Sequence, residues 1–180
     1  MSNSNYKILF TGPVGAGKST AIGSISDISV VTTDEQATDM TQKRKHSTTV
    51  ALDYGRMKLG DGQSIHLYGT PGQERFNFMW DILSQGGIGL VLLLDNTRAD
   101  PFQDMRFFVD AFRGFIDEHK IAVGVTQTDL NKTPKLEEYH AELLKLKLNP
   151  PLFEVDARRR RDVSLLVQAL LYSLDPWLGE

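Results

Sequence analysis

The sequence predicts an α/β domain with a mostly parallel sheet of about six strands, one antiparallel hairpin strand and helices on both faces. Apolar runs typical of buried strands alternate with segments of helical periodicity along most of the chain, which is the order found in parallel sheets. A single hairpin pattern interrupts this alternation near the front. A glycine-rich segment joins the first apolar run to the first expected helix, and it reads Gly12-Pro13-Val14-Gly15-Ala16-Gly17-Lys18-Ser19.

Most of the expected elements follow from the spacing of apolar residues, with a period of two in strands and of three to four in helices. Residues 29–47 are rich in Thr, Asp, Lys and Ser, so we expect a long loop there, a kind of loop that is often functional. Gly60-Asp61-Gly62 lies between two alternating segments and predicts a hairpin turn. The expected strands are 6–11, 49–59, 63–68, 88–94, 121–125 and 153–155, and the expected helices are 18–26, part of 73–85, 101–118, 136–146 and 163–174.

The bulk properties are ordinary for one soluble domain. The 180 residues suffice to bury a core, and we expect a single domain over 1–180 with an ordered part over 5–180. A formal net charge of −3 gives no reason to expect nucleic-acid binding. The lack of cysteine excludes thiol chemistry, prenylation and palmitoylation. With no apolar run of ~18 residues and no signal peptide, we expect a cytoplasmic protein without a direct membrane anchor.

The glycine-rich segment fits G-x-x-x-x-G-K-[ST] without a mismatch. A nucleoside triphosphate is a dense polyanion, and glycines let the backbone turn successive N–H groups toward its phosphates. The helix beginning at Lys18 adds the positive end of its dipole. The Lys18 ammonium bridges the β- and γ-phosphates in such a motif, and the Ser19 hydroxyl is an oxygen ligand for Mg²⁺. The motif therefore predicts binding of a nucleotide phosphate chain.

Together with this motif, Thr49, Asp129 and the run Gly69-Thr70-Pro71-Gly72-Gln73-Glu74-Arg75-Phe76 make the chain resemble a Ras-like small GTPase of the P-loop class. The letters GQERF repeat the second switch of that family, and the resemblance covers nearly the whole chain in order. Gly69 and Pro71 are more similar to bacterial members, such as gliding-motility polarity GTPases and small G proteins encoded beside roadblock-type partners.

The resemblance implies a site for GTP or GDP and Mg²⁺. Thr49 matches the switch threonine that ligates Mg²⁺ with Ser19 and senses the γ-phosphate, although Thr48 is a neighbouring candidate. Gln73 matches the glutamine that orients the attacking water, so the implied catalytic residues are Gln73, Lys18 and Thr49. The residues expected to contact the nucleotide are Gly12, Val14, Gly15, Ala16, Gly17, Lys18, Ser19, Thr20, Gly72, Thr126, Gln127, Asp129, Asp156, Ala157 and Arg158.

The base-binding roles within this set are also implied by the resemblance. Asp129 matches the aspartate that accepts two N–H groups of guanine, a side-by-side pair that adenine does not present. Asp156-Ala157-Arg158 stands where the family has its last base-binding loop, with the Ala157 N–H directed at the guanine oxygen.

The chain departs from the family at several positions. Gly69 stands where an aspartate holds Mg²⁺ through water; Asp95 is a candidate substitute, with a strand-end cap as the alternative. Thr126-Gln127 replaces Asn-Lys, and because Thr126 is short and Gln127 uncharged, we expect weaker and less selective guanine binding. Val14 replaces a glycine and crowds the γ-phosphate, so we expect slow hydrolysis.

These features favour a GTP-dependent molecular switch with slow GTPase activity. The resemblance implies a protein regulator or effector that binds the switch regions, and a roadblock-type protein is the first candidate. Phe76, Phe78 and Trp80 either form an exposed patch for such a partner or pack beneath the switch helix. Two alternatives remain open: a loosely selective NTPase, suggested by Thr126-Gln127, and a pseudo-GTPase that binds nucleotide without turnover, suggested by Gly69 and Val14.

Overall fold

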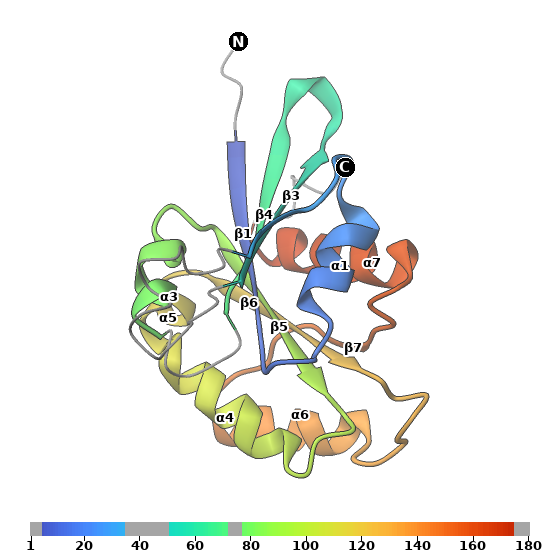
Figure 1. The fold of residues 1–180 in the computed structure, drawn as a ribbon. Helices are drawn as coiled ribbons and strands as arrows, with labels where there is room; N and C mark the ends of the chain where they lie inside the picture. The colour runs from blue at the N-terminus through green and yellow to red at the C-terminus, as the bar shows by residue number, and fades with distance from the viewer. Residues whose placement is uncertain (1–4, 35–50, 72–76, 175–180) are drawn as a thin grey trace, which may run out of the picture.

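The structure is a computed structural model that describes residues 5–34, 51–71 and 77–174 (Figure 1). Strands and helices alternate along the chain after an initial strand, helix and hairpin, as the sequence predicts. The elements are β1 Asn5–Thr11, α1 Lys18–Ile25, β2 Val31–Asp34, β3 Ala51–Lys58, a 3₁₀ turn Gly60–Gly62, β4 Ser64–Gly69, α3 Asn77–Ser84, β5 Gly89–Asp95, α4 Pro101–Ala111, α5 Arg113–Glu118, β6 Lys120–Thr126, α6 Leu136–Lys145, β7 Leu152–Glu154 and α7 Arg160–Leu174.

The sheet has seven strands in the order β2-β3-β4-β1-β5-β6-β7. Strand β3 pairs antiparallel with both of its neighbours, and the pairs from β4 to β7 are parallel. The carboxyl ends of β1, β4, β5 and β6 therefore meet at one edge, where Thr11, Gly69, Asp95 and Thr126 end their strands. In open α/β sheets this is the edge at which ligands bind.

Two hydrophobic cores lie on opposite faces of the sheet. Side chains alternate along a strand, so Val91 and Leu93 of β5 enter one core while Leu90, Leu92 and Leu94 enter the other. Helices α1 and α7 cover the first face and α3 to α6 cover the second (Figure 1). All seven residues of β5 are buried, as expected for a strand covered on both sides. The fold is thus a three-layer α/β domain.

The structure differs from the sequence prediction in two elements. The expected loop over 29–47 contains β2, which pairs with β3 and brings the sheet from about six strands to seven. The helix expected over 101–118 is divided into α4 and α5 at Phe112, whose φ of −102° and ψ of 14° depart from helical values. Phe112 remains 3% exposed, so the core periodicity continues across the break and conceals it in the sequence. Within the described segments, no helix is long and apolar enough to cross a membrane.

Candidate functional site

The phosphate loop between β1 and α1 is formed by glycines at positions that no other residue fits easily. Gly12 has a φ of +144°, and a Cβ atom there would lie 2.1 Å from the carbonyl oxygen of Leu93. Gly17 caps α1 in the left-handed region with a φ of 97°. The first N–H groups of a helix have no partner within it, so this turn directs them at the space in front of the loop. The local geometry agrees with the motif.

The Lys18 side chain is folded over the same loop. Its Nζ donates hydrogen bonds to the carbonyl oxygens of Gly12 at 2.6 Å and of Pro13 at 2.8 Å. Burial lowers the pKa of Lys18 to about 8, the nearby Asp53 carboxylate acts in the opposite direction, and Arg98 lowers the pKa further. A buried ammonium held by two neutral carbonyls would gain strongly from an anion. Lys18 is therefore well placed to bind phosphate oxygens.

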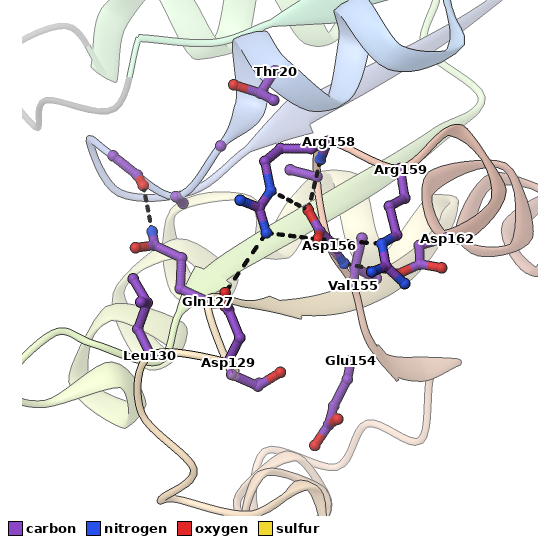
Figure 2. Close-up of a pocket in the computed structure, with 15 residues that line it drawn as sticks. Thr20, Gln127, Asp129, Leu130, Glu154, Val155, Asp156, Arg158, Arg159 and Asp162 are labelled. Carbon is purple, nitrogen blue, oxygen red and sulfur yellow. Dashed lines mark hydrogen bonds and ion pairs between the residues drawn. The ribbon is translucent and has the colours of Figure 1, made fainter.

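A pocket of about 560 Å³ extends from this loop across the edge of the sheet (Figure 2). This volume lies within the usual range for small-molecule sites. Its walls come from the loop and α1 on one side and from the segments after β6 and β7 on the other. They comprise Gly15, Ala16, Gly17, Thr20, Gln127, Thr128, Asp129, Leu130, Glu154, Val155, Asp156, Ala157, Arg158, Arg159 and Asp162. The structure thus brings the two sequence segments expected to bind base and phosphate to one cavity.

Two side chains after β6 connect the base side of the pocket to the phosphate loop. Thr126 Oγ1 donates to the carbonyl oxygen of Ala16 at 2.8 Å, so its short side chain does not prevent this connection. Gln127 Nε2 donates to the carbonyl oxygen of Gly15 at 2.9 Å (Figure 2). Gln127 has a φ of 60°, which turns its side chain back toward the loop. Thr126 and Gln127, which stand in place of the Asn-Lys pair, thus both hold the phosphate loop.

Two acidic groups of the base side, Asp129 and Asp156, lie against Arg158. Arg158 makes a two-point contact with Asp156, in which Nε lies 2.9 Å from Oδ1 and Nη2 lies 2.8 Å from Oδ2. These hydrogen bonds lower the pKa of Asp156 to about 2. Arg158 Nη2 also lies 3.6 Å from Asp129 Oδ2, which Figure 2 marks as an ion pair. The Asp129 side chain is 63% exposed, so its carboxylate remains accessible to a ligand in the pocket.

Asp53, an acidic residue that the sequence analysis did not single out, lies on the phosphate side of the site. The Ser19 hydroxyl donates to Asp53 Oδ2, and the Thr32 hydroxyl donates to Asp53 Oδ1 at 2.9 Å. Asp53 pairs with Gly69 across β3 and β4. The hairpin turn predicted at Gly60-Asp61-Gly62 already implied this pairing and was the signal available in the sequence. Asp95, the candidate substitute, accepts hydrogen bonds from the Thr97 N–H and hydroxyl, as the alternative of a strand-end cap predicts.

Some expected site residues lie outside the described residues: Thr49, with its neighbour Thr48, Gly72 and Gln73. The described segment before Gly72 ends at Pro71, directly after the buried Thr70. Of the three aromatic residues considered as a partner-binding patch, Trp80 is 2% exposed and packs in the core. Its indole N–H donates to the Pro71 carbonyl oxygen at 2.9 Å. Phe76 lies outside the described residues, and the structure does not describe the Phe78 side chain.

Comparison with known proteins shows similarity to Ras-related proteins. The chain is 27% identical to Ras-related protein Rab-27A of Sus scrofa over 190 residues, which cover 95% of this chain and 80% of the relative. It is 27% identical to Ras-related protein Rab-1D of Dictyostelium discoideum, with 88% of this chain and 74% of the relative covered. An uncharacterized protein of Methanocaldococcus jannaschii is 30% identical over 126 residues, covering 68% of this chain and 77% of that protein.

The fold and the phosphate loop define the class of protein: a P-loop domain with a Ras-like fold, similar in sequence to Ras-related proteins. A family model described as "Conserved hypothetical ATP binding protein" matches residues 29–174, and the chain belongs to that family. The matched segment begins after the phosphate loop and includes the base side of the pocket. The family description agrees with the nucleotide-phosphate motif of the chain.

Proposed function

We propose that this protein is a guanine-nucleotide-dependent molecular switch with slow GTP hydrolysis. The observation that carries the proposal is the single pocket bounded by the phosphate loop at one end and by Asp129 at the other. A nucleotide has the same two ends, a polyanion and a base with hydrogen-bonding edges. The Rab homology along 95% of the chain supports guanine as the base.

The phosphate chain is bound by backbone and cation together. The N–H groups of the Gly12–Ser19 loop, including those of Val14, Gly15, Ala16 and Gly17, surround the β-phosphate, and Lys18 exchanges its carbonyl partners for β- and γ-phosphate oxygens. The Thr20 side chain is exposed beside the same space and takes part in binding near the start of α1. The gain for Lys18 is large because its ammonium is already desolvated.

The residues present fit a magnesium ion. Ser19 offers a hydroxyl oxygen and Asp53 a carboxylate beside it, and both are the hard oxygen donors that Mg²⁺ prefers. In the described parts of the chain no cluster of three or more acidic, His or Cys side chains could hold a metal alone, which suits an ion bound largely through substrate phosphates. When bound, Mg²⁺ neutralises charge on the phosphates, and Ser19 and Thr49 are the side chains proposed to hold it.

On the base side, Asp129 accepts the two adjacent N–H donors of guanine, and the Ala157 N–H binds its carbonyl oxygen. Thr126 and Gln127 hold the phosphate loop in register with this site, and Asp156 and Arg158 position the last loop. The family description names ATP, so an adenine nucleotide is the second candidate. Adenine has no such donor pair for Asp129, and for this reason we favour guanine.

Hydrolysis is assigned to residues near the γ-phosphate. Gln73 orients the attacking water, Thr49 reports the γ-phosphate, and Gly72 lies at the start of the second switch; these roles rest on the resemblance. Val14 is 56% exposed on the phosphate loop, and we expect its branched side chain to crowd the space that the water and Gln73 would need. We expect slow turnover that a protein regulator accelerates. The likeness to bacterial polarity GTPases favours a cytoplasmic protein with a roadblock-type partner, and a pseudo-GTPase is the outcome if Val14 and Gly69 together prevent turnover.

Replacing Asp129 by alanine tests the proposed base contact. The variant should lose roughly 10- to 150-fold in affinity for GDP, since a hydrogen bond to a charged group contributes about 1.5–3 kcal/mol, while its weaker affinity for ADP stays unchanged. Competition of both nucleotides against a fluorescent GDP measures this difference. Glu154→Gln is the matched control, because Glu154 is another carboxylate of the same pocket with no assigned base contact. Equal losses for GDP and ADP would refute the role of Asp129.

A further inference from the structure

The side chain of Asp53 lies directly against the position at which a side chain on residue 69 would begin. Asp53 and Gly69 are direct partners in the antiparallel pairing of β3 and β4. A Cβ atom built on Gly69 would lie 3.2 Å from Asp53 Cβ and 3.3 Å from Asp53 Oδ2. A Cβ atom at position 69 would therefore crowd Asp53, which would have to shift by a few tenths of an ångström, and β3 provides the carboxylate at this point.

The contacts of Asp53 direct it toward the phosphate loop. Its side chain is only 6% exposed, and its two oxygens accept hydrogen bonds from Ser19 and Thr32. Because the Ser19 proton is used in this bond, the lone pairs of its oxygen remain free for another partner. Among the described residues Asp53 accepts from these two hydroxyl groups, and a buried carboxylate is stabilised when positive charge also lies near. Lys18, whose charge interacts with Asp53, provides part of that charge from the residue next to Ser19.

We propose that Asp53 is the acidic group of the magnesium site, supplied from β3 instead of from position 69 on β4. It holds the Ser19 hydroxyl with its oxygen available for the ion and provides the negative charge that Gly69 lacks. Asp53 is thus a positioning residue that acts through Ser19 and the ion. The carboxylate that is missing at position 69 is thus supplied by the neighbouring strand, and Asp95 does not supply it. This inference rests on the proposed nucleotide binding and adds a residue to its metal site.

The test measures how release of fluorescent GDP from the full-length protein depends on the Mg²⁺ concentration. Asp53→Asn keeps the size of the side chain and removes its charge. This variant should need about 10–100-fold more Mg²⁺ for half-maximal slowing of release, which is the usual effect of removing a residue that orients a metal ligand. Release in EDTA should match the wild type. Thr32→Val is the matched control: it removes the other hydrogen bond to Asp53 and should leave the Mg²⁺ requirement unchanged.

A carboxylate swap tests the relocation directly and guards against misfolding. Asp53→Gly should raise the Mg²⁺ requirement, and adding Gly69→Asp to that variant should lower it again, because Asp53 contributes two of the three nearest atoms to a Cβ at position 69. Binding of Mn²⁺ to the GDP complex, followed by electron paramagnetic resonance, gives a readout independent of turnover, and thermal unfolding shows whether each variant folds.

The possible outcomes distinguish the role of Asp53 from the proposed nucleotide binding. An unchanged Mg²⁺ requirement in a folded Asp53→Asn protein would overturn the role of Asp53 while leaving nucleotide binding intact. Equally faster release of GDP from Asp53→Asn in Mg²⁺ and in EDTA would also overturn this role, because Asp53 would then support the phosphate loop independently of the ion. Failure of the wild type to bind GDP under either condition would overturn both proposals.

Discussion

Thr126 and Gln127 show that an altered sequence can preserve a structural role. Both side chains donate to carbonyl oxygens of the phosphate loop, at 2.8 Å to Ala16 and 2.9 Å to Gly15. The hydroxyl and the amide supply the donors by which the base side of the pocket holds the phosphate side. Gln127 is uncharged and lacks the lysine side chain that the Ras-like family places over the base. The prediction of weaker guanine binding therefore depends on Gln127 and not on Thr126.

At Val14 the account predicts a direct effect on rate. Val14→Gly should increase single-turnover GTP hydrolysis by roughly 10- to 100-fold, because small displacements of reacting groups change rates by this order. The hydrolysis rate of Val14→Ala should fall between those of the wild type and Val14→Gly, since alanine removes the branching and keeps the Cβ atom. Phosphate release from preloaded protein measures the rates. Three indistinguishable rates would mean that Val14 does not limit hydrolysis.

Site residues were predictable from the sequence when a motif fixes their geometry. The phosphate-loop motif predicts turning glycines at Gly12 and Gly17 and a helix beginning at Lys18, and the structure has these conformations; the contacts of these residues with a nucleotide stay a prediction. Asp53 carries no motif, because its role arises from a neighbour across the hairpin that is distant in sequence. The contact between Arg158 and Asp129 likewise joins the segments after β6 and β7, and sequence reasoning could place these segments together without pairing their side chains.

At the scale of elements, the strands and most helices were predictable because each has a buried face with a regular period. Strand β2 was not, because Val31–Asp34 contains a single strongly apolar residue and depends on pairing with β3. Helix α3 is anchored by Trp80, whose ring stacks on Phe112 with 5.3 Å between centroids. Phe112 lies at the break between α4 and α5, so this aromatic contact connects α3 with both helices.

Close packing of α7 against the sheet gives a stability prediction. A Cβ atom at Gly124 in β6 would lie 2.9 Å from Leu166 and Leu93 side-chain atoms and 3.1 Å from Val155. Gly124→Ala should therefore lower the free energy of unfolding by about 1–3 kcal/mol through overpacking. Gly114→Ala in α5 meets no atom within 4 Å and should raise this free energy by about 0.5–1 kcal/mol. Urea unfolding measures both, and equal effects would contradict the packing described here.

At the scale of the whole molecule, the two cores hold the sheet so that the ends of its strands form one site. β1 leads to the phosphate loop, β4 to the run proposed as the second switch, and β6 and β7 to the two segments proposed to bind the base. Ligand binding at this edge should therefore stabilise the entire domain and not a single loop. The alternation predicted the mostly parallel pairing but not the order of the strands, because right-handed connections reduce the possible arrangements without selecting one.

The most direct test of the central claim is binding of GTP, GDP and ATP with and without Mg²⁺, with release of γ-phosphate followed in the same samples. The account predicts selective binding of guanine nucleotides, tightened by Mg²⁺, with slow release of phosphate from GTP. Tight guanine binding with no release even at high protein concentration would favour the pseudo-GTPase. Equal binding of ATP and GTP would contradict the assignment of Asp129 and, with it, the guanine-dependent switch.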